Sequence, residues 1–203
     1  MDYRTYRFSR REYLRYGLET VGITGVVAFC FYNSLIALAL WPVVAFWYLR
    51  EKKGVLLAKR KAALKGQFKD AVQAIAAALA AGYSVENAVR EAGKDLRLLY
   101  EERTDMVQEL AAMERRMDSN QTLEAAVQDF AERSGLPEAE TFAEIFAVGK
   151  RSGGDLIGIL EDTARTIAQT VETERAIDAA LASRRYEQKI MNLIPFVIVM
   201  YLR

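Results

Sequence analysis

Apolar residues recur every three or four positions through the middle of this 203-residue chain, from about residue 55 to residue 187. Between residues 66 and 82, for example, the stripe consists of Phe68, Val72, Ile75, Ala76 and Leu79. Comparable stripes lie within residues 85–92, 106–113, 123–130, 142–149 and 156–171. This spacing gathers apolar side chains on one face of an α-helix, the face that a soluble helix buries. The pattern therefore predicts an all-α fold with a bundle of about six helices.

Turn and capping residues separate these stripes. Gly82 can end the first helix in the left-handed conformation, and Ser84 then offers an N-cap for the next helix. Thr122 has the same position after the turn DSNQ, and Pro137 suits the first turn of a later helix. The last stripe meets no proline or other clear stop before Pro195, so we expect one long final helix from about residue 155.

Two of the predicted helix starts match each other. The segments Ser84–Val89 and Thr122–Val127 both consist of a cap, an apolar residue, a glutamate, a variable residue, an alanine and a valine. A duplicated helix pair would explain this likeness. The common needs of capped amphipathic helices would explain it equally well, because the cap and the acid satisfy free N–H groups.

Residues 21–49 differ from the rest of the chain because they contain no charged side chain. Their length exceeds the roughly 20 residues that cross a bilayer. Asn33 and Ser34 interrupt the run near its middle, and basic residues flank it on both sides. Because positive charge favours the cytoplasmic side, a transmembrane hairpin satisfies both flanks better than a single tilted span. A hydrophobic hairpin inside a soluble protein is the third alternative.

The predicted organisation has five parts along the chain. They are a basic cytoplasmic segment (1–20), a transmembrane hairpin (14–49), a basic juxtamembrane linker helix (50–65), a cytoplasmic helical domain (66–187) and the start of a C-terminal transmembrane helix (188–203). The final apolar run is too short to span a bilayer, so the chain reads as though it stops inside a membrane helix. The residues that we assign to the membrane part are Val21, Trp41, Pro42, Trp47 and Pro195.

Charge and composition argue against several functions. The chain has 28 Lys and Arg against 27 Asp and Glu, a balance that disfavours nucleic acid as the main partner. It has no histidine, the most common general base and metal ligand near neutral pH. Its single cysteine, Cys30, excludes a cysteine-based zinc site. We expect no cofactor, no metal and no catalytic residue.

The stretch AVGKRSGGDL, residues 147–156, is the part of the chain that most resembles a nucleotide-binding loop. A P-loop needs Gly-x-x-x-x-Gly-Lys followed by Ser or Thr, after a strand. Here Glu144 stands at the first glycine position, Arg151 follows Lys150, and the preceding segment is helical by pattern. We interpret the stretch as a turn between two helices, with Asp155 near the start of the second.

Two groups of acidic residues are formal candidates for metal binding or acid–base chemistry. They are Glu101, Glu102 and Asp105, and Glu138, Glu140 and Glu144. Both groups lie on predicted helix faces of mixed charge, so solvated surface charge is the simpler interpretation.

Three stretches together resemble the type II secretion F-domain family. They are FKDAVQAIAAALAAGYSVENAV, ERSGLPEAETFAEIFAVGKRSGGDLIGILEDTA and EQKIMNLIPF. The most similar branch is that of the TadB/TadC-like platform proteins of tight-adherence (Tad) pilus systems. The resemblance covers nearly the whole chain, and the family has the same order of membrane hairpin, cytoplasmic helical domain and membrane helices.

This resemblance implies a multi-pass platform protein of the bacterial inner membrane, at the base of a type IV pilus, Tad pilus or type II secretion machine. Such a protein has no catalytic activity of its own. It couples a cytoplasmic hexameric assembly ATPase to the extraction and polymerisation of pilin subunits. The implied partners are the ATPase, the pilins, membrane lipids, and a second platform protein or another copy of the chain. Nucleic acid is not among them.

The turn motifs of the family map onto two places in this sequence. The Ala-Gly-x-Ser turn corresponds to Ala81, Gly82 and Ser84. The Gly-x-x-Ser/Thr-Gly-x-Leu turn corresponds to Gly149, Ser152, Gly153, Gly154 and Leu156. In secretion-type relatives an acid commonly follows the first glycine, whereas this chain has Lys150. We expect these turns to be structural or to contact a partner.

Taken with the helix pattern, the resemblance predicts a rigid adaptor that is docked on the ATPase. The helix from about 155 to 187 would then pass motion to the membrane segment at 190–202. The basic residues within 50–69 are expected beside anionic lipid headgroups. The alternative is a membrane-anchored helical signalling or scaffold protein, which would need a regular heptad dimer stripe in 155–187. Charged residues make that stripe only partly regular; they are Glu172, Glu174, Arg175 and Asp178.

Overall fold

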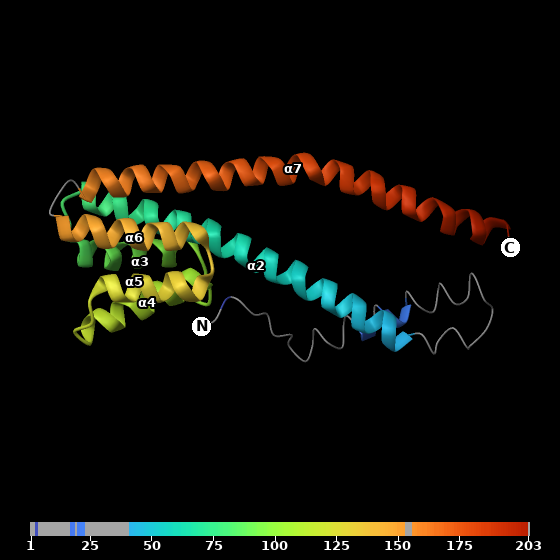
Figure 1. The fold of residues 1–203 in the computed structure, drawn as a ribbon, viewed down its shortest axis with the longest axis horizontal. Helices are drawn as coiled ribbons and strands as arrows, with labels where there is room; N and C mark the ends of the chain where they lie inside the picture. The colour runs from blue at the N-terminus through green and yellow to red at the C-terminus, as the bar shows by residue number, and fades with distance from the viewer. Residues whose placement is uncertain (1–2, 4–16, 19, 23–40, 153–155, 203) are drawn as a thin grey trace. The chain divides into compact units, whose positions relative to one another are not determined.

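The computed structural model describes Tyr3, residues 17–18 and 20–22, and residues 41–152 and 156–202. Its helices are α2 (Trp41–Ala80), α3 (Val85–Leu99), α4 (Asp105–Asp118), α5 (Leu123–Ser134), α6 (Pro137–Ser152) and α7 (Leu156–Leu202). These ranges contain no strand, so the predicted all-α class is confirmed (Figure 1). Most of the predicted membrane hairpin, residues 23–40, lies outside the described residues, as do Gly153, Gly154 and Asp155.

The described chain divides into two compact units. The larger unit contains Tyr3 and Lys59–Glu174, and the described residues of the other lie within 17–22, 41–58 and 175–202. Both boundaries fall inside a helix, because α2 and α7 each pass from one unit to the other without a break. The larger unit is built from all of α3 to α6 and one part each of α2 and α7. The predicted bundle of about six helices is therefore confirmed.

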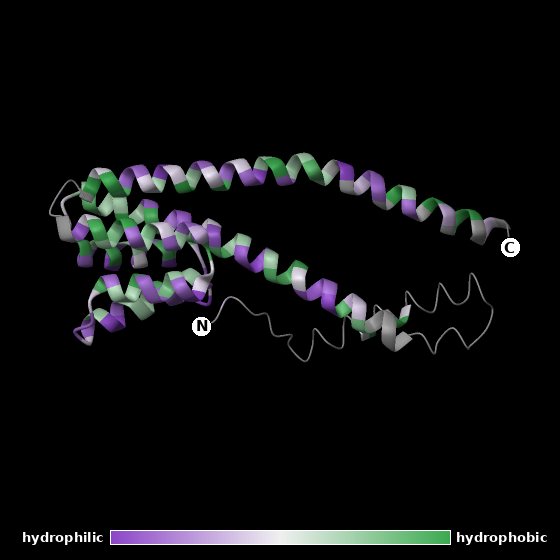
Figure 2. Ribbon diagram, viewed as in Figure 1, coloured by the Kyte–Doolittle hydropathy of each residue, from purple (hydrophilic) through white to green (hydrophobic). Residues whose placement is uncertain are grey.

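The core of the larger unit consists of the faces that the apolar stripes predict. The ring of Phe68 in α2 lies 5.7 Å from that of Phe130 in α5 and 5.6 Å from that of Phe142 in α6. Leu110 of α4 and Leu160 of α7 are also completely buried. Each such side chain contributes about 1.5–3 kcal/mol when it leaves water. Figure 2 shows the resulting interleaving of hydrophobic and hydrophilic residues along these helices.

The predicted caps are confirmed. Ser84 Oγ accepts a hydrogen bond from the backbone N–H of Asn87, and Thr122 Oγ1 accepts one from that of Ala125. Gly82, with φ of 90°, has the left-handed backbone that was expected after α2. Because only glycine adopts this conformation at little cost, the turn between α2 and α3 depends on that residue.

Some details of the sequence-based prediction are wrong. The sequence pattern predicts a third helix over residues 102–117, but this helix begins at Asp105, because Thr104 takes the extended conformation of an N-cap residue. The predicted stripe of α6 ends in Val148 or Gly149, and of these two Gly149 is buried whereas Val148 is 63% exposed. Ile159 belongs to the predicted stripe of the last helix, yet it is 39% exposed. Val148 and Ile159 lie on the two helices that lead into and out of the α6–α7 turn.

The two long helices extend beyond the larger unit. The prediction that the last helix continues through Pro195 is confirmed, because α7 ends at Leu202. Within the described ranges, no helix combines the length and the apolar character needed to cross a membrane. The described turns have a simple arrangement within the larger unit. The connections at 81–84 and 119–122 and the C-terminal end of α6 lie at one end of it (Figure 1).

Candidate functional site

Lys150, near the end of α6, joins the two matching helix starts. Its Nζ lies 2.8 Å from Glu86 Oε1 in the first turn of α3 and 3.2 Å from Glu124 Oε1 in the first turn of α5. Each glutamate lies two residues after its capping residue, Ser84 or Thr122. We call Lys150, Glu86 and Glu124 the Lys150 junction. Sequence reasoning singled out Lys150 and both helix starts but did not predict that they meet.

The Lys150 junction is half-buried and its charges support one another. Burial alone would lower the pKa of the Lys150 ammonium, but the hydrogen bonds to Glu86 and Glu124 outweigh burial and raise it. The hydrogen bond from Lys150 and the backbone N–H groups of the first turn lower the pKa of Glu86. Glu124 Oε2 is buried and has no hydrogen-bond partner among the described residues. Lys150 and Glu86 are therefore both charged at neutral pH.

The structure brings together only part of the two family-motif turns. Gly82 and Ser84 precede Glu86, and Gly149 is buried beside Lys150. The motif residues that lie around the Lys150 junction are therefore Gly82, Ser84, Gly149 and Lys150 itself. Ser152 is the last residue of α6 and Leu156 the first of α7.

The residues that were assigned to the membrane lie in the other unit. Trp41 and Pro42 begin α2, Trp47 is 69% exposed on the same helix, and Pro195 lies inside α7. Val21 lies within a short helical stretch, residues 20–22, and is 45% exposed. Their placement in a membrane remains a prediction.

The two acidic groups that sequence inspection identified do not form metal sites. Asp105 pairs with Arg60 in α2, whose Nε and Nη2 donate to its carboxylate at 2.8 and 2.7 Å. Glu138 pairs with Lys65. Among the described residues, no three histidine, cysteine or acidic side chains are grouped so that they could hold a metal ion.

Lys65 was predicted to lie in a basic linker near lipid, but it lies inside the helical bundle. Its Nζ is 2.6 Å from Glu138 Oε1 in α6 and 2.7 Å from Glu174 Oε1 in α7, and the residue is only 9% exposed. We call these three residues the Lys65 clasp. Arg60 and Lys61 also bind within the unit, to Asp105 and to the carbonyl of Gly135. The ammonium of Lys65 is therefore bound within the bundle, and lipid contact of the basic segment remains a prediction.

A second buried ion pair was not predicted. Arg133 donates to both oxygens of Glu109, at 2.8 and 2.7 Å, and the hydroxyl of Tyr3 donates to Glu109 Oε1 at 2.8 Å. Burial would raise the pKa of Glu109, but the hydrogen bonds from Arg133 and Tyr3 outweigh it and lower the pKa. One sequence signal was present, because Glu109 interrupts the apolar stripe of α4 beside Leu110.

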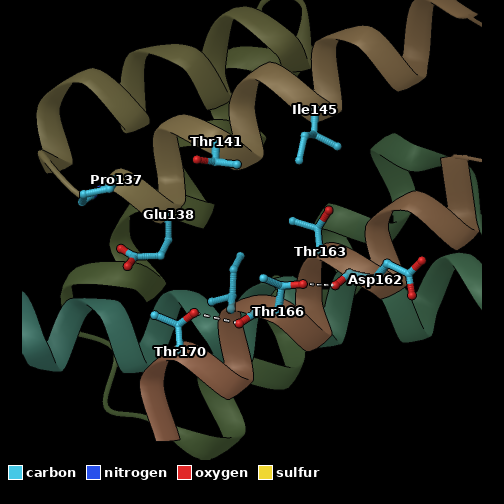
Figure 3. Close-up of a pocket in the computed structure, with 9 residues that line it drawn as sticks. Pro137, Glu138, Thr141, Ile145, Asp162, Thr163, Thr166 and Thr170 are labelled. Atoms are coloured by element: carbon cyan, nitrogen blue, oxygen red, sulfur yellow. Dashed lines mark hydrogen bonds between the residues drawn. The ribbon is translucent and has the colours of Figure 1, made fainter. Parts of the chain in front are cut away.

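A groove of about 370 Å³ lies between α6 and α7 (Figure 3). Its walls are two turns of α6, from Pro137 to Ile145, and two turns of α7, from Asp162 to Thr170. Glu138 lies at one end and Asp162 at the other, since the two helices run antiparallel (Figure 3). We call it the α6–α7 groove.

Comparison with known proteins gives one match. A family model, described as type II secretion system (T2SS), protein F, matches residues 71–202. No curated protein and no solved structure matches the chain. The matched residues begin inside α2 and include the Lys150 junction and the α6–α7 groove.

Proposed function

The chain belongs to the type II secretion system protein F family, and on that premise we propose that it is an inner-membrane platform protein of a Tad pilus, type IV pilus or type II secretion machine. In this role it couples a hexameric cytoplasmic ATPase to the extraction and polymerisation of pilin subunits. A second platform protein or another copy of the chain completes the assembly. The chain itself performs no chemistry.

The observation that carries this proposal is that Gly82 and Ser84 of one family-motif turn and Gly149 and Lys150 of the other lie together at one end of the larger unit. Lys150 ties the end of α6 to the starts of α3 and α5, so three helix ends form one half-buried, charged surface. Tyr83 and Val148, beside this junction, are 47% and 63% exposed. Exposed apolar side chains bordered by charged groups are typical of a protein contact surface. We propose that the ATPase docks here.

The long helices provide the coupling in this proposal. α7 starts at the end of the unit where we place the ATPase and continues without a break to Leu202. Inside the unit its apolar side chains pack in the core, namely Leu160, Ala164, Ile167 and Val171. A helix that is held over about three turns transmits a tilt or rotation to its other end, because its hydrogen-bond ladder resists local bending. The same burial disfavours the scaffold alternative. The apolar side chains in the first half of the predicted dimer stripe already pack in the core of the unit and are not available to a second copy.

Surface variants test the docking end without disturbing the core. In cells that assemble the machine, Tyr83→Asp together with Val148→Asp should abolish co-purification of the ATPase with the full-length protein, and pilus assembly should fail. Leu98→Asp is the matched control, because Leu98 is 86% exposed near the other end of α3. If both proteins retain the ATPase, the docking surface lies elsewhere.

A second experiment separates docking from coupling. Proline at both Ala168 and Gln169 interrupts α7 inside the unit. The expected result is retained ATPase binding with no pilus assembly. Normal assembly by this variant would exclude transmission through α7.

A further inference from the structure

The α6–α7 groove is a second surface whose chemistry differs from that of the Lys150 junction. None of its nine lining residues is basic, whereas Glu138 and Asp162 supply a carboxylate at either end. Glu138 and Glu174 share the single ammonium of Lys65, so that end keeps a net negative charge. Asp162 has a side chain that is 78% exposed and forms a loose ion pair with the exposed Arg165 of the same helix, at 3.6 Å. Each end of the groove therefore carries an acidic side chain, and we call these its acidic ends.

The threonine hydroxyl groups on the floor of the groove can accept hydrogen bonds, but their protons are already donated to backbone carbonyls. Threonines from α7 line it, and each hydroxyl donates to the carbonyl four residues earlier: Thr163 to Ile159, Thr166 to Asp162, and Thr170 to Thr166. A bound partner could therefore pack against the threonine methyl groups and donate hydrogen bonds to the remaining hydroxyl lone pairs. Ile145 and Ile167 add apolar surface between the two acidic ends.

The dimensions match the side chains of one helix face. Eight residue steps separate Pro137 from Ile145 and Asp162 from Thr170, which corresponds to a length of about 12 Å at 1.5 Å per residue. On a docked helix, residues seven positions apart share one face and lie about 10.5 Å apart. Two basic residues with that spacing would reach both acidic ends, and small aliphatic residues between them would cover the threonine methyl groups.

We propose that the α6–α7 groove binds an amphipathic helix of a partner protein that carries Lys or Arg at positions i and i+7 with small aliphatic residues between them. A second copy of this chain that presented the same face would oppose acid to acid, so charge disfavours that occupant. This proposal stands apart from the platform role, because it rests on the groove alone and would hold for any partner of this chemistry.

A designed peptide pair tests the charge requirement. The probe is a fluorescein-labelled, 16-residue alanine–leucine helix with lysines at i and i+7, and its control has glutamates at those positions. Anisotropy with the full chain in non-ionic detergent should show binding of the lysine peptide only, weakening as salt increases. Equal binding of both peptides would overturn the proposal.

Matched variants at adjacent positions test the location. Thr166→Trp fills the groove and should weaken the binding of the lysine peptide by roughly tenfold or more. Glu161→Trp, on the exposed side of the same helix, should leave that binding unchanged. Asp162→Asn should lower the affinity for the lysine peptide about threefold, and Glu161→Gln should leave this affinity unchanged. Unchanged binding by Thr166→Trp, with an unaltered melting curve, would refute the proposal. So would a change in self-association by Thr166→Trp without an effect on the peptide, which would identify the groove as a contact between copies.

Discussion

The Arg133–Glu109 pair allows the sharpest test of how the helical unit is held together. Replacing Arg133 with methionine keeps most of its aliphatic packing but removes both hydrogen bonds to the Glu109 carboxylate. Glu109 has a side chain that is 6% exposed, and the hydrogen bond from the hydroxyl of Tyr3 would remain. An uncompensated buried charge costs about 3–5 kcal/mol. Because Arg133 is 26% exposed and water can enter in its place, we expect the substitution to lower the free energy of unfolding by about 2–3 kcal/mol at pH 7.

The pH dependence of this loss identifies its cause. In the native protein the pKa of Glu109 is held below its ordinary value of 4.5, so the stabilisation is present above that value and is lost as pH falls through the lowered pKa. In Arg133→Met the opposing effect of burial dominates and raises the pKa of Glu109. The variant can then relieve its penalty by taking up a proton. The difference in unfolding free energy between the two proteins should therefore shrink between pH 7 and pH 5.

Urea unfolding of the full chain, followed by far-ultraviolet circular dichroism, measures both effects. The midpoint of Arg133→Met should fall by about 1–2 M at pH 7, for a slope of about 1.5 kcal/mol per M. Arg115→Met, at an exposed position on α4, is the control and should change the free energy by less than about 0.5 kcal/mol. A loss that is equal at both pH values, or no larger than that of the control, would mean that Glu109 is not a buried charge.

Three further substitutions test other parts of the unit. Lys65→Met leaves the carboxylates of Glu138 and Glu174 without their shared ammonium, so we expect a loss of about 2 kcal/mol and faster amide exchange in α7 before residue 174; unchanged exchange there would contradict a clasp. Gly82→Val forces a β-branched residue to φ of 90° and should lower thermal stability by the equivalent of about 1–3 kcal/mol, although a Cβ there meets no neighbouring atom. Ser84→Ala removes the cap of α3 and should cost about 1 kcal/mol in urea unfolding, a value that Ser84→Thr should largely restore.

The all-α class, the number of helices and most of their ends followed from the sequence. Those features depend on local chemistry: three-to-four spacing, capping hydroxyls such as that of Ser84, and a glycine such as Gly82 where the backbone must turn left-handed. Val148 shows the limit of the method. It continues the spacing of the α6 stripe, but which part of a stripe is buried depends on the neighbouring helices, and the side chain of Val148 is 63% exposed.

The charged contacts could not be predicted because they join residues far apart in the chain. Lys65 meets Glu174 across 109 positions, and Tyr3 meets Glu109 across 106. In sequence, Lys65 looks like any other basic residue of the segment before the bundle. Only the packing of α2 against α6 and α7 places it where water is excluded. A surface assignment from local composition fails at such positions, since a paired charge is buried without any change in its neighbours along the chain.

The Lys150 junction gives the likeness between the two helix starts a physical reason that neither earlier explanation included. Capping alone requires a hydroxyl residue and favours an acid anywhere in the first turn. It does not require the same position for the acid in both helices. Here Glu86 and Glu124 occupy the same position after their caps because both must reach one ammonium, Lys150 Nζ. An acid at position 150 would place three carboxylates together and would destabilise the contact between the ends of α3, α5 and α6. The charges of Lys150, Glu86 and Glu124 therefore depend on one another. If the charge at position 150 becomes negative, a favourable contact requires that the charges at positions 86 and 124 change as well.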